Sequence, residues 1–103
     1  MLKVILTEDA DATLEDIIHY YLTEHSTGRA AKVVQSVDLA FEQISKAPLR
    51  FPKCLDILEP DENVRQIVVH STFRIIYRIK PDYIQIIEIF HGNRNDQLLK
   101  DIK

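Results

Sequence analysis

The spacing of the apolar residues changes halfway along the chain, and this change limits the folds that the chain can adopt. Residues 14–25 and 29–46 carry apolar side chains at the three- and four-residue spacing of amphipathic helices. Residues 64–70, 73–79 and 83–90 are instead rich in Ile, Val, Tyr and Phe, which favour strands. The short breaks between these runs are typical of hairpins. We therefore predict a helical hairpin packed on a mainly antiparallel sheet, an α+β fold.

A further strand and a long loop complete the predicted order. Residues 2–6 form a short apolar strand before the first helix, whose cap we expect at Asp11 or Thr13. Gly28 is expected to end this helix, because glycine readily takes the left-handed conformation found there. The prolines in residues 48–63 predict a loop. The order β-α-α-β-β-β gives a three- to four-stranded sheet, and it leaves the neighbour of the first strand open.

The composition is that of an ordinary globular domain. The 103 residues are 46% hydrophobic and 28% charged, so we expect residues 1–103 to form a single domain. No apolar run approaches the roughly 20 residues that a membrane helix needs, and we expect no membrane contact. The first residues lack the basic and apolar regions of a secretion signal. The single cysteine, Cys54, fits a reducing compartment, and we expect a cytoplasmic protein.

The sequence contains no pattern for metal or cofactor binding. Its four histidines and one cysteine are not spaced like zinc ligands. Its two glycines, Gly28 and Gly92, stand alone, so there is no glycine-rich phosphate loop. We therefore expect neither a metal nor a cofactor.

Charge is divided unevenly along the chain. The formal net charge is −3, but residues 1–63 carry 6 Lys and Arg against 12 Asp and Glu. Residues 64–103 carry 7 Lys and Arg against 4 Asp and Glu. An asymmetry of this kind indicates that one part of the surface faces an acidic or polyanionic partner.

Four arginines and one histidine in the basic half are the candidate functional residues. Arg74 and Arg78 lie four residues apart in one predicted strand, hence on the same face. We expect adjacent strands to bring Arg65, Arg74 and Arg94 together, and guanidinium groups capture phosphates and carboxylates well. The alternative is a solvated sheet face that resists aggregation. His91 suits proton transfer, and it equally suits an ordinary hydrogen bond at a strand end.

A succession of motifs runs along nearly the whole chain. The most specific part is the strand 73–79 followed by residues 86–94, which end in His91-x-x-Arg94. Supporting positions lie in the helices, the loop and the first strand of the second half: Ala12, Asp16, Ile17, Tyr20, Tyr21, Ile44, Pro48, Phe51, Pro52 and Arg65. This succession resembles the RelE/ParE superfamily of toxins from bacterial type II toxin–antitoxin systems. The resemblance implies a RelE/ParE-like α+β domain.

The resemblance implies one of two main activities. ParE-like members poison DNA gyrase, whereas RelE-like members bind the ribosomal A site and cut mRNA. In a RelE-like protein, Arg65, Arg74, His91 and Arg94 would be the catalytic residues of a metal-free cleavage, with His91 as acid or base. In a ParE-like protein, the same residues would form a surface that docks on the target, without enzyme activity.

Two departures favour the ParE-like branch. A lysine of the RelE-like cluster is replaced by Ile67, and residues 95–103 contain no counterpart of the catalytic C-terminal tyrosine. The long helical hairpin and the His91-x-x-Arg94 pattern also look more ParE-like. We therefore expect a ParE-like toxin of a plasmid stabilisation system that poisons gyrase. The alternatives are an mRNA interferase and a degenerate toxin fold that only binds its antitoxin.

Each of these interpretations implies a protein partner. The resemblance predicts a cognate antitoxin whose acidic or amphipathic segment lies along the helical hairpin and a sheet edge, and it leaves open a hetero-oligomer of the two. DNA gyrase is the second expected partner, with the ribosome and mRNA as the alternative.

Overall fold

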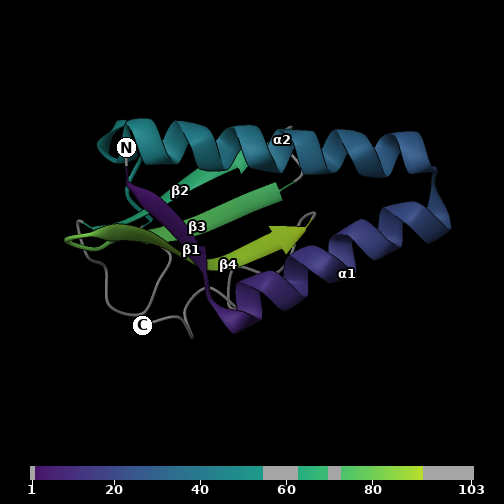
Figure 1. The fold of residues 1–103 in the computed structure, drawn as a ribbon, viewed down its shortest axis with the longest axis horizontal. Coiled ribbons are helices and arrows are strands. Elements are labelled where there is room, and N and C mark those ends of the chain that lie inside the picture. Colours follow the sequence, from purple (N-terminus) through teal and green to yellow (C-terminus); the bar gives the residue numbers. More distant parts are fainter. Residues whose placement is uncertain (1, 55–62, 70–72, 92–103) are drawn as a thin grey trace.

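The chain folds into two helices and a four-stranded mixed sheet, the α+β fold that the sequence predicts (Figure 1). The computed structural model describes residues 2–54, 63–69 and 73–91. The elements are, in order, β1 (Lys3–Leu6), α1 (Glu8–Glu24), α2 (Thr27–Lys46), the 3₁₀ helix η1 (Pro48–Arg50), β2 (Val64–Val69), β3 (Phe73–Ile79) and β4 (Tyr83–His91). Neither α1 nor α2, nor any other helix in these ranges, has the length and apolar character needed to cross a membrane.

Helix α1 begins earlier than the sequence predicts, because Thr7 caps it. The Thr7 hydroxyl accepts a hydrogen bond from the backbone N–H of Ala10 at 3.1 Å. Asp11 and Thr13, the caps expected from the sequence, lie inside the helix. The same hydroxyl donates to the carbonyl oxygen of Ile87 at 2.9 Å. Thr7 therefore fixes the start of α1 against β4.

The connection between the helices is shorter than predicted. The Ser26 hydroxyl accepts a hydrogen bond from the N–H of Arg29 at 3.1 Å and caps α2, so that Gly28 lies in the first turn of α2. The prediction that Gly28 ends α1 is therefore wrong. Helix α1 ends at Glu24, and His25 caps it by donating its N–H to the carbonyl oxygen of Tyr21 at 3.1 Å. Figure 1 shows the two helices meeting at this turn and diverging along the sheet.

The strand order in the sheet is β1-β4-β3-β2. Strands β2, β3 and β4 are antiparallel neighbours, as the short breaks between them predict. Strand β1 lies at the edge and pairs parallel with β4, Lys3 opposite Tyr83 and Leu6 opposite Ile86. The first strand therefore neighbours the last one, which the sequence did not decide.

A β-bulge in β4 decides which of its side chains enter the core. Ile76 pairs with Glu88 and Tyr77 with Ile86, so Ile87 is the extra residue. Strict alternation from Ile86 would place Glu88 in the core. The bulge instead directs Glu88 to α1, where its carboxylate accepts hydrogen bonds from the Thr13 hydroxyl at 2.9 Å and from the N–H of Ile89 at 3.0 Å.

Apolar side chains pack on both faces of the sheet. The larger cluster joins the helices to one face of the sheet: Ala10, Ile17, Val33, Val37, Ala40, Ile44, Ile67, Val69, Phe73, Ile75, Tyr77, Ile84, Ile86 and Ile89. We call this side of the sheet the helix face. A smaller cluster of Cys54, Val64, Ile76 and Phe90, with Ile87 against it, lies on the opposite side, the outer face.

Residues 52–54, which follow η1, lie beside β2 at the edge of the sheet. Lys53 forms an antiparallel bridge with Arg65, and the N–H of Cys54 donates to the carbonyl oxygen of Val64 at 3.0 Å. The rest of the predicted loop, residues 55–62, lies outside the described residues. Residues 52–54 thus extend the sheet beyond β2.

Candidate functional site

Arg74 and Arg78 both lie on the outer face of the sheet, as predicted. Paired residues of neighbouring strands share a face, and Arg74 is opposite Val68 while Arg78 is opposite Val64. Both arginine side chains are partly exposed. Four residues of strand separate them by about 13 Å. They therefore act at opposite ends of the outer face.

The described strands contribute little negative charge to the outer face. Among the strand residues that the structure describes, Glu88 is the only carboxylate, and it accepts hydrogen bonds from Thr13 and Ile89. The Nε atom of Arg78 is buried without a hydrogen-bond partner. The outer face therefore offers positive charge to a partner with acidic or phosphate groups.

Arg65 does not join Arg74, in contrast to the expectation from the sequence. Arg65 pairs with Tyr77 and so lies on the helix face. Tyr77 is three residues from Arg74, which adds about 10 Å along the strand. The Arg65 guanidinium donates to the carbonyl oxygen of Phe51 at 2.7 Å and to that of Leu49 at 3.4 Å. Arg65 thus holds the chain after η1 against the sheet.

Tyr77 holds the same segment from inside the core. Its side chain is fully buried, and its hydroxyl donates to the carbonyl oxygen of Pro48 at 2.5 Å. Burial raises the pKa of Tyr77 to about 12, and the nearby positive charge of Arg65 opposes that rise. Because the phenol keeps its proton, it donates to Pro48 at all physiological pH values. Tyr77 and Arg65 together position η1.

The end of β4 carries the remaining predicted residues. His91 is the last residue of β4 and pairs with Phe73, next to Arg74 in β3. The structure thus brings the backbone of His91 beside that of Arg74, at the end of the sheet near the turn between the helices (Figure 1). Arg94 lies outside the described residues. Of the four predicted residues, Arg74 and His91 are the two that the structure places at one end of the sheet.

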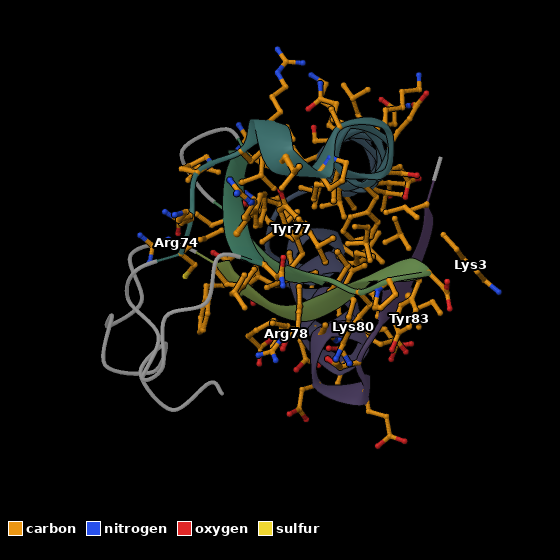
Figure 2. All side chains as sticks on the ribbon, turned by 90° about the vertical axis from the view of Figure 1, so that its left-hand side faces the viewer. Lys3, Arg74, Tyr77, Arg78, Lys80 and Tyr83 are labelled. Atoms are coloured by element: carbon orange, nitrogen blue, oxygen red, sulfur yellow. The ribbon has the colours of Figure 1, made fainter. Side chains whose placement is uncertain are left out.

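Sequence reasoning missed two lysines near this surface. Figure 2 shows Lys80 beside Arg78 and Tyr83 on the side of the sheet away from α2, and Lys3 at the β1 edge. Lys80 follows β3 in the turn to β4, where its N–H donates to the carbonyl oxygen of Tyr83 at 2.9 Å. The parallel pairing of β1 with β4, which brings Lys3 opposite Tyr83, has no signal in the sequence.

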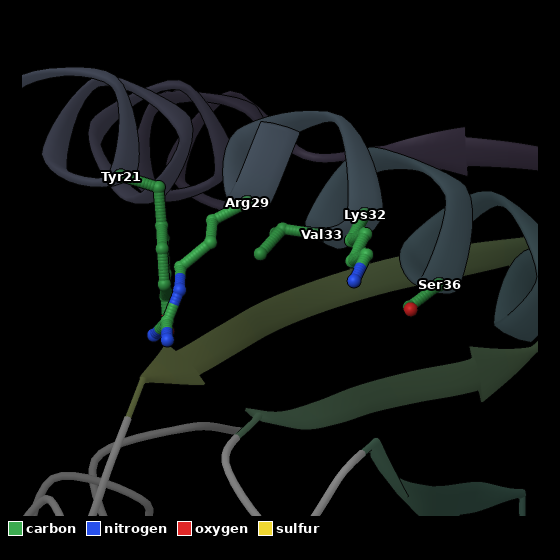
Figure 3. Close-up of a pocket in the computed structure, with 5 residues that line it drawn as sticks. All are labelled: Tyr21, Arg29, Lys32, Val33 and Ser36. Atoms are coloured by element: carbon green, nitrogen blue, oxygen red, sulfur yellow. The ribbon is translucent and has the colours of Figure 1, made fainter. Parts of the chain in front are cut away.

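A second basic site lies between the two helices. An open pocket of about 310 Å³ is lined by Tyr21 of α1 and by Arg29, Lys32, Val33 and Ser36 of α2 (Figure 3). The hydrophobic spacing of α2 marks Val33 as apolar, but it gives no sign that the cations share a pocket with Tyr21. We call this site the interhelix pocket.

Within residues 2–54, 63–69 and 73–91, no group of three or more His, Cys, Asp or Glu side chains is arranged to hold a metal ion. The lone cysteine, Cys54, is buried with its thiol in the smaller cluster.

Comparison with known proteins identifies the fold and the family of this chain. A structure described as the chromosomal ParDE TA system from P. aeruginosa superposes with a TM-score of 0.71 at 21% sequence identity, covering 90% of this chain and 98% of the other. The fold is thus RelE/ParE-like. The family model of the ParE toxin of the type II toxin–antitoxin system, parDE, matches residues 4–96. The chain belongs to this ParE toxin family. No curated protein sequence matches it.

Proposed function

We propose that this ParE toxin stops growth by poisoning DNA gyrase, and that its outer face docks on the target. Membership of the ParE family supports this target over the ribosome. The observation that carries the proposal is the position of Arg65. RNA cleavage of the RelE type would draw on Arg65 and Arg74 together, whereas here they lie on opposite faces of the sheet and Arg65 binds backbone carbonyls.

Docking requires no bond chemistry from the toxin. Arg74 and Arg78 offer guanidinium groups to carboxylates or phosphates of the target, and such bidentate contacts are directional as well as strong. Lys80 adds positive charge beside Arg78 (Figure 2). We propose that Arg94, which follows β4 in the sequence, contributes a further positive charge to docking. Long-range attraction then steers the toxin toward the acidic or nucleic-acid surface of the complex.

The partner that neutralises the toxin is its cognate antitoxin. A parDE system pairs the toxin with a ParD antitoxin, so the family implies this partner. We propose that the antitoxin covers the helical hairpin and an edge of the sheet. We infer that binding there blocks the toxin by preventing access of the target.

Controlled expression in cells tests the proposed target. We expect growth arrest with an SOS response and gyrase-linked DNA breaks. Arrest of translation with cut mRNA would instead identify an mRNA interferase, and the absence of any growth defect would leave a fold that only binds its antitoxin. Either of these results contradicts the proposal.

Substitutions test the proposed surface. Arg74→Ala and Arg94→Ala are expected to reduce toxicity at unchanged protein level. Arg50→Ala is the matched control, because Arg50 is exposed in η1 and lies outside the outer face. If both Arg74→Ala and Arg94→Ala kept full toxicity, the proposal that the outer face docks on the target would be wrong.

A further inference from the structure

A row of three side chains crosses the sheet at the end where β3 turns into β4. Tyr83 of β4 pairs with Lys3 of β1 on one side. On its other side lies Lys80, whose N–H donates to the carbonyl oxygen of Tyr83 at 2.9 Å. Because paired residues share a face and Lys80 is two residues from Arg78, all three lie on the outer face with Arg78. We call Lys80, Tyr83 and Lys3 the lysine row.

The backbone of the sheet sets the spacing of the cations. Neighbouring strands lie about 4.8 Å apart, so the two lysines begin about 10 Å apart with Tyr83 between them. Arg78 lies about 7 Å from Lys80 along the chain. Figure 2 shows Arg78, Lys80 and Tyr83 on the side of the sheet away from α2, with Lys3 at the β1 edge. Paired strands therefore hold three cations in one small patch.

The fold does not use the charge of these three cations. Lys3 is exposed, and Arg78 and Lys80 are partly exposed. Within residues 2–54, 63–69 and 73–91 none of them belongs to an ion pair, because the ion pair found there joins Lys46 to Glu42. The Nε atom of Arg78 has no hydrogen-bond partner either. Their positive charge is therefore available to an anion.

Few carboxylates of the described chain lie near the lysine row. In β1, β3, β4 and the turn between β3 and β4, the carboxylates are Asp82 and Glu88, and Glu88 accepts a hydrogen bond from Thr13. The acidic first turn of α1 follows Leu6, which lies about 10 Å from Lys3 along β1. Charges more than about 10 Å apart are largely screened at 0.1 M salt. The net charge of −3 therefore does not keep a polyanion from this patch.

The regular charge of duplex DNA suits this patch better than an acidic protein segment. Phosphates recur about every 3.4 Å along each DNA strand, so each of the three cations finds a phosphate without a special arrangement of the ligand. An acidic protein segment would instead need carboxylates at matching intervals. Arg, Lys and Tyr side chains are also among the groups that bind phosphate oxygens in protein–DNA complexes.

We propose that the lysine row, together with Arg78, binds the phosphate backbone of duplex DNA. The Lys3 and Lys80 ammonium groups and the Arg78 guanidinium each contact a phosphate, and the Tyr83 hydroxyl donates a further hydrogen bond. The inference rests on the proposed function for its biological setting, in which the DNA is the duplex that gyrase holds. Contacts to phosphates carry no sequence information, so the binding is independent of sequence.

Fluorescence anisotropy of a labelled duplex of about 20 base pairs tests this proposal with the purified full chain and no gyrase. Each phosphate contact contributes about 0.9 to the slope of log affinity against log salt, so three contacts weaken binding roughly fortyfold between 50 and 200 mM salt. A duplex of unrelated sequence is expected to bind equally well. No binding at 50 mM salt, or a strong preference for one sequence, would overturn the proposal.

Charge-matched variants locate the binding site. The double variant Lys3→Gln, Lys80→Gln leaves Arg78 of the three cations, so affinity at 50 mM salt should fall at least tenfold and the loss between 50 and 200 mM salt should shrink to about fourfold. The control Lys32→Gln, Lys46→Gln removes the same charge from exposed positions of α2 and should bind like the parent chain. Circular dichroism checks that both variants are folded. Equal weakening in both would assign the effect to overall charge and contradict the proposal.

A competitor separates DNA from an acidic protein surface as the ligand. Unlabelled duplex is expected to displace the labelled duplex at a concentration of negative charge at least tenfold lower than a polyglutamate peptide needs. Equal displacement by the peptide would show a general acidic-surface site, and the DNA proposal would be wrong. Because gyrase is absent, a negative result here leaves the proposed target untouched, and a failure to inhibit gyrase would not change the measured binding of DNA.

Discussion

The Arg65 guanidinium donates a hydrogen bond of 2.7 Å to the carbonyl oxygen of Phe51, from the helix face of the sheet. An arginine that the sequence assigns to a target surface is thereby engaged within the fold. The same side chain also reaches the carbonyl oxygen of Leu49. Arg65 and Tyr77 then define the path of the chain from α2 into the sheet.

Removing the Arg65 side chain is expected to destabilise the fold. Hydrogen bonds to charged groups contribute about 1.5–3 kcal/mol, so Arg65→Ala should lower the free energy of unfolding by roughly that amount. Urea denaturation followed by circular dichroism measures the change. Arg50→Ala, which removes an exposed arginine of η1, should stay within about 0.5 kcal/mol of the parent chain. Equal stability of Arg65→Ala and the parent chain would show that the contact with Phe51 contributes nothing.

The raised pKa of Tyr77 predicts that the protein loses stability at alkaline pH. Its pKa in the fold is about 12, above the value of 10.0 for a free phenol, so folding favours the protonated form. This contribution is fully present below pH 10 and is lost as the pH rises toward 12. The two units correspond to about 2–3 kcal/mol of unfolding free energy.

The variant Tyr77→Phe isolates that contribution. It should be less stable than the parent chain at neutral pH by about 1 kcal/mol, through loss of the hydrogen bond to Pro48. Between pH 10 and 12 the difference should shrink or reverse, because phenylalanine does not ionise. Tyr20→Phe, at an exposed position, should follow the parent chain throughout. Parallel pH curves for Tyr77→Phe and the parent chain would contradict the assignment.

The Thr7 cap of α1 is expected to contribute measurably to the free energy of unfolding. Because its hydroxyl caps α1 and also bonds Ile87, Thr7→Ala should cost about 1–2 kcal/mol of unfolding free energy. Thr7→Ser keeps the hydroxyl and should retain most of the stability. Thr23→Ala, which removes an exposed hydroxyl bonded within α1, is the control and should have little effect. A similar thermal midpoint for Thr7→Ala and Thr23→Ala would argue against the cap.

Periodicity predicted the two helices and the three strands of the second half because each segment buries one regular stripe. The first turn of α1 escaped prediction, since Glu8, Asp9 and Asp11 leave no apolar stripe there and Thr7 competes with two other good caps. Gly28 misled the prediction for a local reason: the cap formed by Ser26 allows a glycine within the first turn of α2.

The candidate site was harder to predict than the fold. Arg74 and Arg78 share a face because β3 pairs with β2 without interruption between them, so alternation alone places them. The face of Arg65 depends on the register of β2 against β3, which follows from packing of the whole sheet. The interhelix pocket depends on the angle between α1 and α2. No local sequence pattern predicts the register of β2 against β3 or the angle between α1 and α2.

Inhibition of gyrase by the purified toxin tests the central claim most directly. Negative supercoiling of relaxed plasmid by DNA gyrase is measured with increasing toxin, with and without the cognate antitoxin. The account predicts inhibition that the antitoxin reverses, and at least tenfold weaker inhibition by the Arg74→Ala, Arg78→Ala variant than by Arg50→Ala. Full supercoiling activity at several times the toxin concentration that binds the antitoxin would contradict it.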